Sequence, residues 1–473
     1  MDYYRDRLKT YLPLLKESPA ELSYIKEVVE AYHQLEKHQK SIDVLLEALE
    51  HHPEEEWIHF KLGLIYQKLK KYKKAFLSHQ KVSEINPDNK WNWQQAGYCL
   101  TFLNRYKEAL RYYKSAKAIG ADRWTLNQLG YCNYKLKDYE LALAYHLEAN
   151  KTPNGVEQEN DAWELNQIGD CYSQLGNYEA AVDYHQKALK LWPTDAWTMG
   201  QLGFNLQHLT RYKEALAIHQ KVYELYPNNS WNIGQIGFCL QRLGKHYEAI
   251  TYHKEAYALN PANHWQLMQI AFNTSKVGNY RKALEDYERL TELCPDNFQT
   301  WEGAAYCHKE LFDYDNALKY YQKAHELIPG NAIVLDNLGH CYLEMGNWQE
   351  AKRLFLKSRE ADDQRVWNLK HLGWIELQQG FPIKAQKYLL RATDKSSPEG
   401  IDLMRLAHTF WVLNKEAEAD KFYLKALNAY EDREQLIDAF YDDMGLLEKY
   451  GIPYGDCMNK KIAFSFWDKS SPL

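Results

Sequence analysis

The sequence predicts an all-α solenoid of stacked helical hairpins, and three observations support this fold class. Glycine-containing segments recur every 34 residues. Apolar side chains within each period follow helical spacing, and helix-ending residues fall at fixed places between them. Because a two-helix unit of this size cannot bury both its faces alone, its neighbours must complete its core. The 473 residues should therefore form one elongated array, although their length alone suggests roughly three globular domains.

The period is set by segments such as LGYCN at 129–133 and IGFCL at 236–240. With their glycine taken as position 8, twelve units occupy residues 22–433, with one shortened and one lengthened unit. The units begin at residues 22, 56, 90, 123, 162, 196, 230, 264, 298, 332, 366 and 400. The segment 151–161, KTPNGVEQEND, is an insertion in the array, and we expect a hinge or contact loop there.

Each unit should contain two helices, named A and B here. Positions 4, 7 and 11 form the apolar stripe of helix A, and a breaker near position 15, such as Gly176, suits the left-handed conformation that ends a helix. Helix B has a small residue at position 20, such as Ala109, where a larger side chain would hold the helices apart. Proline at position 32, as in Pro193, ends helix B.

A 34-residue hairpin with Gly at position 8, Ala at 20, an aromatic residue near 24, Ala at 27 and Pro at 32 resembles the tetratricopeptide repeat (TPR) family. The resemblance implies a right-handed superhelix with an extended concave groove. Apolar stripes at 8–15 and 436–447 predict capping helices within 1–21 and 434–450, and 451–473 remains as a tail. The rings of Phe464, Phe466 and Trp467 should dock on the C-terminal cap or enter a groove.

By the same resemblance, positions 2, 6, 9 and 13 of helix A line the concave groove. Tryptophan recurs at position 2, glutamine at position 6 in six consecutive units, and aromatic residues at position 9. We predict a peptide-binding surface made of Trp91, Trp124, Trp163, Trp197, Trp231 and Trp265 at position 2, Gln95, Gln128, Gln167, Gln201, Gln235 and Gln269 at position 6, and Tyr98, Tyr131, Phe204, Phe238 and Phe272 at position 9.

The glutamine row suggests how such a surface would bind. A side-chain amide offers both a donor and an acceptor, so it can pair with the C=O and N–H groups of an extended peptide backbone. The row is similar to the asparagine ladder in the TPR superhelix of O-GlcNAc transferases, which implies a grip on extended protein segments. The tryptophans are additional to the large apolar residue at position 4. Packing against the preceding unit and a binding role both fit them.

Other recurring residues are interpreted as packing residues. Six cysteines occur once per repeat, not in close pairs, which indicates buried thiols in a reducing compartment. Histidine recurs at position 24 of helix B, one repeat apart, and other units have Tyr or Phe there, so metal binding is disfavoured. These histidines are His79, His146, His185, His219 and His253.

Composition and motifs narrow the function. No Walker loop, HExxH or G-x-S-x-G motif occurs, so we expect a protein without enzymatic activity, metal or cofactor. Lys+Arg 58 against Asp+Glu 64 gives a net charge of -6, which disfavours nucleic acid. Apolar runs fall short of the roughly 18 residues that span a bilayer, and the N-terminus lacks the apolar run of a secretory signal. We expect a cytoplasmic protein with no membrane partner.

The leading hypothesis is a scaffold that binds an extended peptide or protein segment. A carbohydrate-binding groove is the first alternative, because aromatic faces stack on sugar rings while amides pair with hydroxyls. An accessory subunit of an enzyme complex, such as a glycosyltransferase, is the second. A carboxylate clamp for chaperone tails is disfavoured, because Trp, Gln and aromatic residues stand where that clamp needs Lys and Asn.

Overall fold

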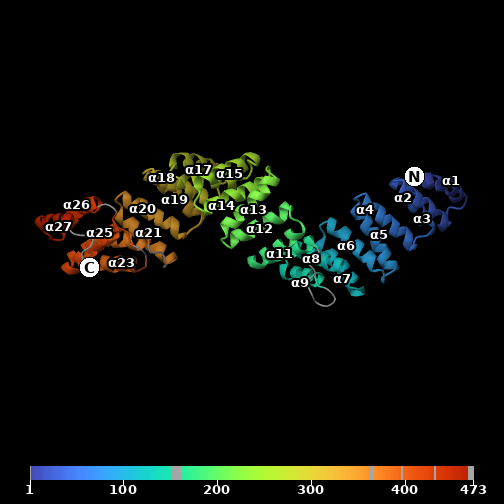
Figure 1. Cartoon of the computed structure of the whole chain (residues 1–473), viewed down its shortest axis with the longest axis horizontal. Helices are drawn as coiled ribbons and strands as arrows, with labels where there is room; N and C mark the ends of the chain where they lie inside the picture. Colours follow the sequence, from blue (N-terminus) through green and yellow to red (C-terminus); the bar gives the residue numbers. More distant parts are fainter. Residues whose placement is uncertain (1, 152–160, 363–366, 396–397, 431–432, 467–473) are drawn as a thin grey trace. The chain divides into compact units, whose positions relative to one another are not determined.

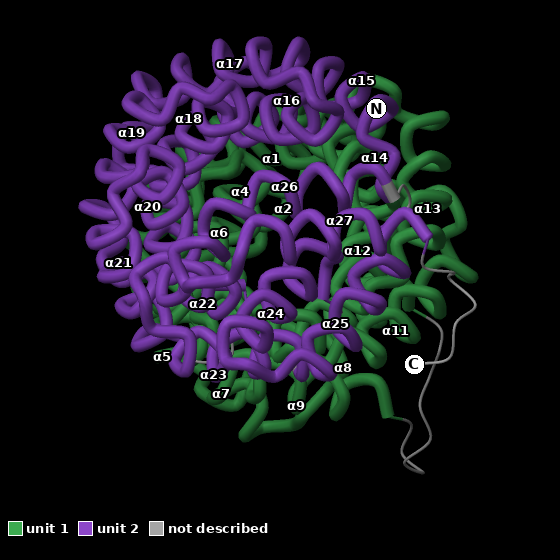
Figure 2. The backbone as a smooth tube through the Cα atoms, turned by 90° about the vertical axis from the view of Figure 1, so that its left-hand side faces the viewer, with its two compact units in different colours: residues 1–243 green, residues 244–473 purple. Residues whose placement is uncertain are grey.

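The computed structural model describes residues 2–151, 161–362, 367–395, 398–430 and 433–466. These residues form 27 helices and no strand, so the predicted all-α fold of stacked hairpins is confirmed (Figure 1). Contacts divide the chain into two compact units, residues 1–243 and residues 244–473 (Figure 2). Most of the predicted insertion at 151–161 lies outside the described residues.

The helices of the first unit are α1 Asp2–Glu17, α2 Leu22–Gln34, α3 His38–His51, α4 Glu56–Lys68, α5 Tyr72–Ile85, α6 Lys90–Phe102, α7 Tyr106–Ile119, α8 Arg123–Lys135, α9 Tyr139–Ala149, α10 Ala162–Gln174, α11 Tyr178–Leu191, α12 Ala196–His208, α13 Tyr212–Leu225 and α14 Ser230–Arg242. Those of the second unit are α15 His246–Leu259, α16 His264–Lys276, α17 Tyr280–Leu293, α18 Phe298–Glu310, α19 Tyr314–Leu327, α20 Ala332–Glu344, α21 Trp348–Ala361, α22 Trp367–Gln378, α23 Pro382–Lys395, α24 Gly400–Val412, α25 Glu416–Ala429, α26 Arg433–Lys449 and α27 Tyr454–Phe466.

The helix boundaries follow the 34-residue period. Helix A of eleven units begins at the predicted first residue, and α22 begins one residue later, at Trp367. The even-numbered helices α2 to α24 are therefore the A helices, and the odd-numbered helices α3 to α25 are the B helices.

Position 15 has the left-handed conformation in all twelve repeats. Glycine occupies it in five repeats, for example Gly176 with φ 77°. In the other seven units a residue with a side chain has a φ between 55° and 66°. These residues are Glu36, Lys70, Asn104, Lys137, Thr210, Phe312 and Asn414. Since left-handed backbone costs such residues about 1–2 kcal/mol, packing of the hairpin must impose the turn wherever glycine is missing.

In six repeats the glycine at position 8 allows the hairpin to close around a ring at position 24. A Cβ atom added to Gly130 would lie 2.6 Å from the ring of His146, and one added to Gly97 would lie 2.7 Å from the ring of Tyr113. Both rings are fully buried. Glycine is therefore required here by the close approach of helix A to a large side chain of helix B.

The five position-24 histidines are buried, and His146, His185, His219 and His253 pair with amides. Nδ1 of His146 lies 2.9 Å from Oδ1 of Asn127, and Nδ1 of His219 lies 2.8 Å from Oδ1 of Asn232 on the next helix A. Burial lowers the pKa of each of the five imidazoles to about 4, because the charged form would lose its hydration. These rings are thus neutral parts of the core.

The two ends of the chain are closed by extra helices. At the N-terminus, α1 packs on the first hairpin through Leu8. At the C-terminus, the predicted tail includes a helix, α27, whose Phe464 is buried 4.9 Å from the ring of Phe440 on α26. Phe464 therefore docks on the cap, whereas Phe466 is exposed and Trp467 lies outside the described residues.

The buried histidines should make the fold sensitive to mild acid. Their folded pKa of about 4 lies below the unfolded value of about 6.5, so the unfolded chain binds more protons below pH 6.5. The free energy of unfolding should fall between pH 6.5 and pH 4, by about 2 kcal/mol per histidine at pH 5. Urea denaturation at pH 7.5 and pH 5 measures this loss.

A His79→Tyr variant tests the assignment, because Tyr113 occupies the equivalent place in the next unit. We expect it to lose less stability between the two pH values than the parent does. A His51→Tyr variant at an exposed position is the control, and it should behave like the parent. An undiminished loss in His79→Tyr contradicts the assignment.

Candidate functional site

The position-2 tryptophans are packed at one edge and open elsewhere. Six of them are 36% to 49% exposed, and each meets the position-24 ring of the preceding helix B at 73° to 81° and 5.7 to 6.5 Å. The six are Trp91, Trp124, Trp163, Trp197, Trp231 and Trp265. Such edge-to-face contacts fix an indole while leaving part of its surface accessible. Packing and availability to a ligand are therefore compatible.

The position-6 glutamines differ in whether their amides already have partners. Oε1 of Gln95 accepts a hydrogen bond of 3.0 Å from Gln67, and Oε1 of Gln128 accepts one of 3.4 Å from Tyr113. Gln269 is buried. Within the described part of the chain, the side-chain amides of the remaining three have no hydrogen-bond partner. These three are Gln167, Gln201 and Gln235, all in the first unit.

Residues from positions 2, 6 and 9 line common pockets in the first unit. A pocket of about 770 Å³ between α4, α6 and α8 is lined by Trp91, Gln95, Tyr98 and Trp124, among others. A second pocket, of about 300 Å³, is lined by Tyr98 and by three predicted residues of the next two repeats, Gln128, Tyr131 and Trp163.

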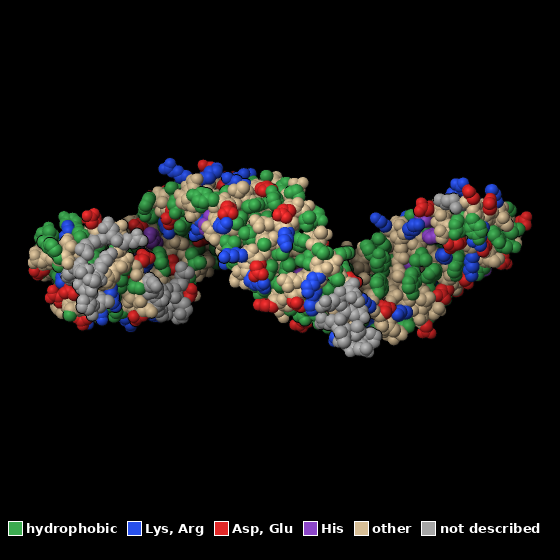
Figure 3. Space-filling view, in the orientation of Figure 1, with side chains coloured by type: hydrophobic (Ala, Val, Ile, Leu, Met, Phe, Trp, Pro, Cys, Tyr) green, Lys and Arg blue, Asp and Glu red, His purple; other side chains and the backbone are tan. Residues whose placement is uncertain are grey.

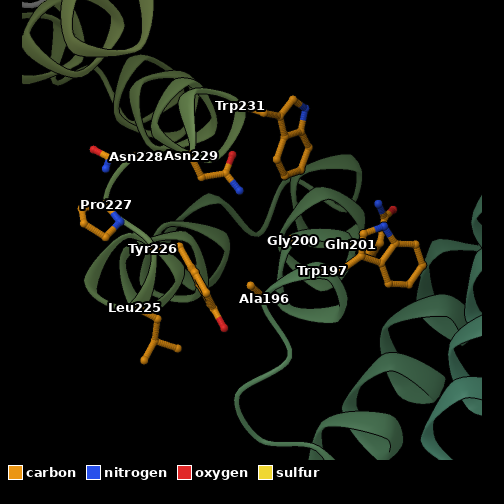
Figure 4. A pocket seen from close by; sticks show the side chains of 10 residues that line it. All are labelled: Ala196, Trp197, Gly200, Gln201, Leu225, Tyr226, Pro227, Asn228, Asn229 and Trp231. Atoms are coloured by element: carbon orange, nitrogen blue, oxygen red, sulfur yellow. The ribbon is translucent and has the colours of Figure 1, made fainter. Parts of the chain in front are cut away.

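The largest of these pockets has a volume of about 810 Å³ and lies between α12, α13 and α14 (Figure 4). Trp197 and Gln201 line it from α12, and Trp231 lines it from α14. A Cβ atom added to Gly200 would lie 3.1 Å from the Trp231 ring, so this glycine leaves room for the indole over the backbone of α12.

Tyr226 and Asn229 also line this pocket, and neither was predicted from the sequence. They precede α14 in the turn from helix B to the next helix A, outside the helix-A positions that the repeat singles out. Tyr226 is 49% exposed, and Asn229 caps α14 by accepting a hydrogen bond of 3.1 Å from the backbone N–H of Asn232. Apolar residues recur directly before the proline at position 32, as Trp192 does. This pattern could have predicted the ring of Tyr226.

The aromatic row at position 9 continues into residues 244–473, but its rings are not accessible throughout them. Nζ of Lys276 lies 5.4 Å from the ring centroid of Phe272. Further along, Trp374 is buried beneath Leu446 of α26. A C-terminal helix therefore covers the helix-A face at this position.

Family models for the tetratricopeptide repeat match residues 58–89, 121–194, 160–228 and 296–364. These matches fall on the hairpins described above. These parts of the chain are tetratricopeptide repeats. No curated protein matches the chain.

Solved structures similar to this TPR protein have low identity. A tetratricopeptide repeat protein from Parabacteroides merdae is 17% identical, with a TM-score of 0.45, covering 53% of this chain and 98% of its own. Human IFIT1, solved as a dimer with m7Gppp-AAAA, is 17% identical, with a TM-score of 0.39 and coverage of 73% and 91%. Yeast Tom70 is 16% identical, with a TM-score of 0.40 and coverage of 93% and 98%. At these scores the likenesses carry no information on what this chain binds.

One residue of this TPR protein interrupts the aromatic row with a carboxyl group. Asp170 is at position 9 of its 34-residue repeat and is buried. Burial raises its pKa to about 8, and the charge of Lys135 only partly opposes this. Nε2 of His185 lies 3.8 Å away, but burial lowers the pKa of that ring to about 4. Both groups are therefore mainly neutral at pH 7, and they do not form an ion pair.

An Asp170→Asn variant should stabilise the fold at alkaline pH. Because the folded pKa lies above the unfolded value of about 3.9, unfolding releases a proton between pH 4 and pH 8, and the parent loses stability as pH rises through this window. The variant keeps a neutral side chain throughout. We expect it to exceed the parent by a few kcal/mol at pH 8, with little difference at pH 4, in urea denaturation.

The exposed Asp88→Asn change is the control and should show no such trend. A stability difference that does not change with pH contradicts the raised pKa of Asp170.

Proposed function

We propose that this TPR protein is a non-enzymatic scaffold that binds an extended segment of another protein along the helix-A face of residues 1–243. The observation that carries the proposal is the set of unpaired amides at Gln167, Gln201 and Gln235. Each amide belongs to a helix whose position-2 tryptophan is half exposed. Polar groups at these positions and open indole surface are the two components that peptide recognition needs.

The amides would bind the backbone of the segment, and the rings would bind its side chains. Each amide can donate to a peptide carbonyl and accept from a peptide N–H, with a net contribution of about 0.5–1.5 kcal/mol per hydrogen bond. Because these hydrogen bonds involve only the backbone of the bound segment, segments of many different sequences can form them. Half-exposed indoles then contribute apolar area, and they need little further ordering because one edge is already fixed.

Protein is a better partner than nucleic acid for this surface. The net charge is -6, and Figure 3 shows Lys and Arg interspersed with Asp and Glu on the face in view. Phosphate-binding proteins usually concentrate positive charge instead. No described helix has both the length and the apolar character needed to cross a bilayer. All eight cysteines are free, which suits a reducing compartment such as the cytoplasm.

A carbohydrate is the second candidate ligand, and one pocket favours it. Trp197, Tyr226 and Trp231 surround the space of about 810 Å³ together with the amides of Gln201 and Asn229. Aromatic rings can cover the apolar faces of sugar rings, while amides pair with hydroxyl groups. Saturable binding to a glycan array that disappears in a Trp197→Ala, Trp231→Ala variant would establish this function instead.

Replacing the three unpaired amides tests the main proposal. A Gln167→Ala, Gln201→Ala, Gln235→Ala variant should retain the fold, because the amides have no partners to lose. It should capture at least about tenfold less partner protein from the native cell, since three amide contacts are lost. Quantitative mass spectrometry of the captured proteins measures the change, and circular dichroism checks the fold.

The matched control replaces three exposed glutamines of the same unit that lie outside the row, Gln174, Gln186 and Gln220. This triple variant should capture its partners as the parent does. Equal capture by both triple variants in folded protein would show that the glutamine row does not bind the partner.

A further inference from the structure

Position 13 adds positively charged side chains to the helix-A face. It lies four residues after position 9 and seven after position 6, so the three positions share one side of the helix. In residues 1–243 it is Lys68, Lys135 and Arg242 in three repeats and His208 in a fourth. All four residues are exposed. The face that carries the glutamine row therefore also carries a row of basic residues.

Position 13 lines the same pockets as the rings and amides. Lys68 lines the pocket of about 770 Å³ together with Trp91 and Gln95. Phe102, which occupies position 13 in the next repeat, lines the pocket of about 300 Å³ together with Gln128. A segment held by the amides is therefore within reach of the side chains at position 13.

Aromatic rings hold two of the cations in place. Nζ of Lys135 lies 5.2 Å from the ring centroid of Tyr131, at position 9 of the same repeat. The guanidinium carbon of Arg242 lies 5.2 Å from the ring centroid of Tyr212, and its Nε donates a hydrogen bond of 3.2 Å to the hydroxyl of that ring. This bond uses one of the five N–H groups of the guanidinium, which leaves its Nη atoms for a carboxylate.

The three permanent cations have no carboxylate partner of their own. Across the residues that the structure describes, Lys68, Lys135 and Arg242 form no ion pair. By contrast, Arg105, three residues after position 13 of its repeat, pairs with Glu108 at 2.6 Å. A carboxylate from a bound segment can therefore approach the position-13 cations without displacing an internal partner.

Little negative charge on this face opposes such an approach. In the six repeats that begin at residues 56 to 230, positions 2, 6, 9 and 13 contain one acidic residue, Asp170. Burial raises its pKa to about 8, so it is mainly neutral at pH 7 and leaves the charge of Lys135 largely unopposed. A further cation, Lys61 at position 6, already pairs with Glu30 at 2.8 Å. The face is thus positively charged on a chain whose net charge is -6.

We propose that the extended segment bound by this TPR protein is acidic, and that Lys68, Lys135 and Arg242 bind its Asp and Glu side chains. The inference rests on the proposed function, since it names the class of partner for the same face. Hydrogen bonds from the amides accept many sequences, and the cations then select among them by charge. RNA is disfavoured, because it carries a negative charge at every nucleotide and three separated cations neutralise few of them.

Fluorescence anisotropy of the full chain with labelled probes tests the charge preference. Three peptides of about 40 residues, which reach about 130 Å when extended, alternate Ser with Glu, Gln or Lys. An oligouridylate with the same number of charges as the Glu peptide is the fourth probe. At low salt we expect the Glu peptide to bind about tenfold more tightly than the Gln peptide, because three exposed ion pairs form. The Lys peptide should bind most weakly, and high salt should remove most of these differences.

A Lys68→Gln, Lys135→Gln, Arg242→Gln variant separates recognition from helix stability, because basic residues in the last turn also stabilise a helix. This variant should lose the preference for the Glu peptide and should bind the Gln peptide as the parent does. A purely structural role predicts lower thermal stability with an unchanged preference.

The matched control replaces three exposed lysines of B helices in residues 1–243 with Gln. These are Lys114, Lys190 and Lys221. The control has the same net charge as the position-13 variant and should keep the full preference. An equal loss in both variants would mean that overall charge, and not this row, attracts the peptide.

Three further results would overturn the inference. One is a parent that binds the Glu peptide no more tightly than the Gln peptide, or that binds neither. Another is tighter binding of the oligouridylate than of the Glu peptide. The third is a position-13 variant whose preference is unchanged.

The Gln167→Ala, Gln201→Ala, Gln235→Ala variant distinguishes failure of this inference from failure of the proposed function. It should weaken binding of the Glu and Gln peptides by the same factor. If it does so while the position-13 variant keeps its preference, only the inference about charge fails. If it weakens neither peptide, the proposed function fails and the inference fails with it.

Discussion

The ring at position 24 of helix B is the contact on which both the stack and the candidate groove depend. It lies against the glycine at position 8 of its own unit, where a Cβ atom would overlap it, as Gly130 and His146 show. It also meets the edge of the tryptophan that begins the next unit, as His146 and Trp163 show. One side chain thus sets the distance between the two helices of a hairpin and fixes the indole of the following one.

This arrangement explains why a core position can accept His, Tyr or Phe. All three rings are flat and can present a face to glycine and to the tryptophan edge. Histidine and tyrosine also carry polar atoms, and some of these pair with amides or hydroxyls, as His219 does with Asn232 and Tyr113 with Thr101. The position-24 rings are therefore partly polar but neutral, which avoids the cost of buried charge at this position.

Much of the fold could be predicted from the sequence, because glycine, alanine and proline recur at positions where sterics permit little else. The left-handed residue at position 15 could be recognised only where it is glycine. At Lys70 or Phe312 the turn is imposed by packing that a single position does not reveal. The course of α26 over Trp374 was also not predictable, since it follows no repeat.

The candidate site could be predicted only in part. Its helix-A positions follow from the period, but whether an amide has a hydrogen-bond partner depends on a neighbour in another repeat. Nε2 of Gln67 donates to Oε1 of Gln95, whereas the amide of Gln201 has no such partner among the described residues. Tyr226 enters the pocket between α12, α13 and α14 from a turn, outside the helix-A positions that the period singles out. Such relations between units exist only in the folded chain.

The central claim is that the tryptophans are fixed at one edge and open to a bound segment elsewhere. Hydroxyl-radical footprinting, read by mass spectrometry with and without captured partner protein, tests this most directly. We expect Trp197 and Trp231 to be oxidised in the free protein and protected in the complex, while the exposed Trp192 outside the pocket is oxidised equally in both. Resistance of Trp197 and Trp231 to oxidation in the free protein, or the same oxidation with partner bound, would contradict the account.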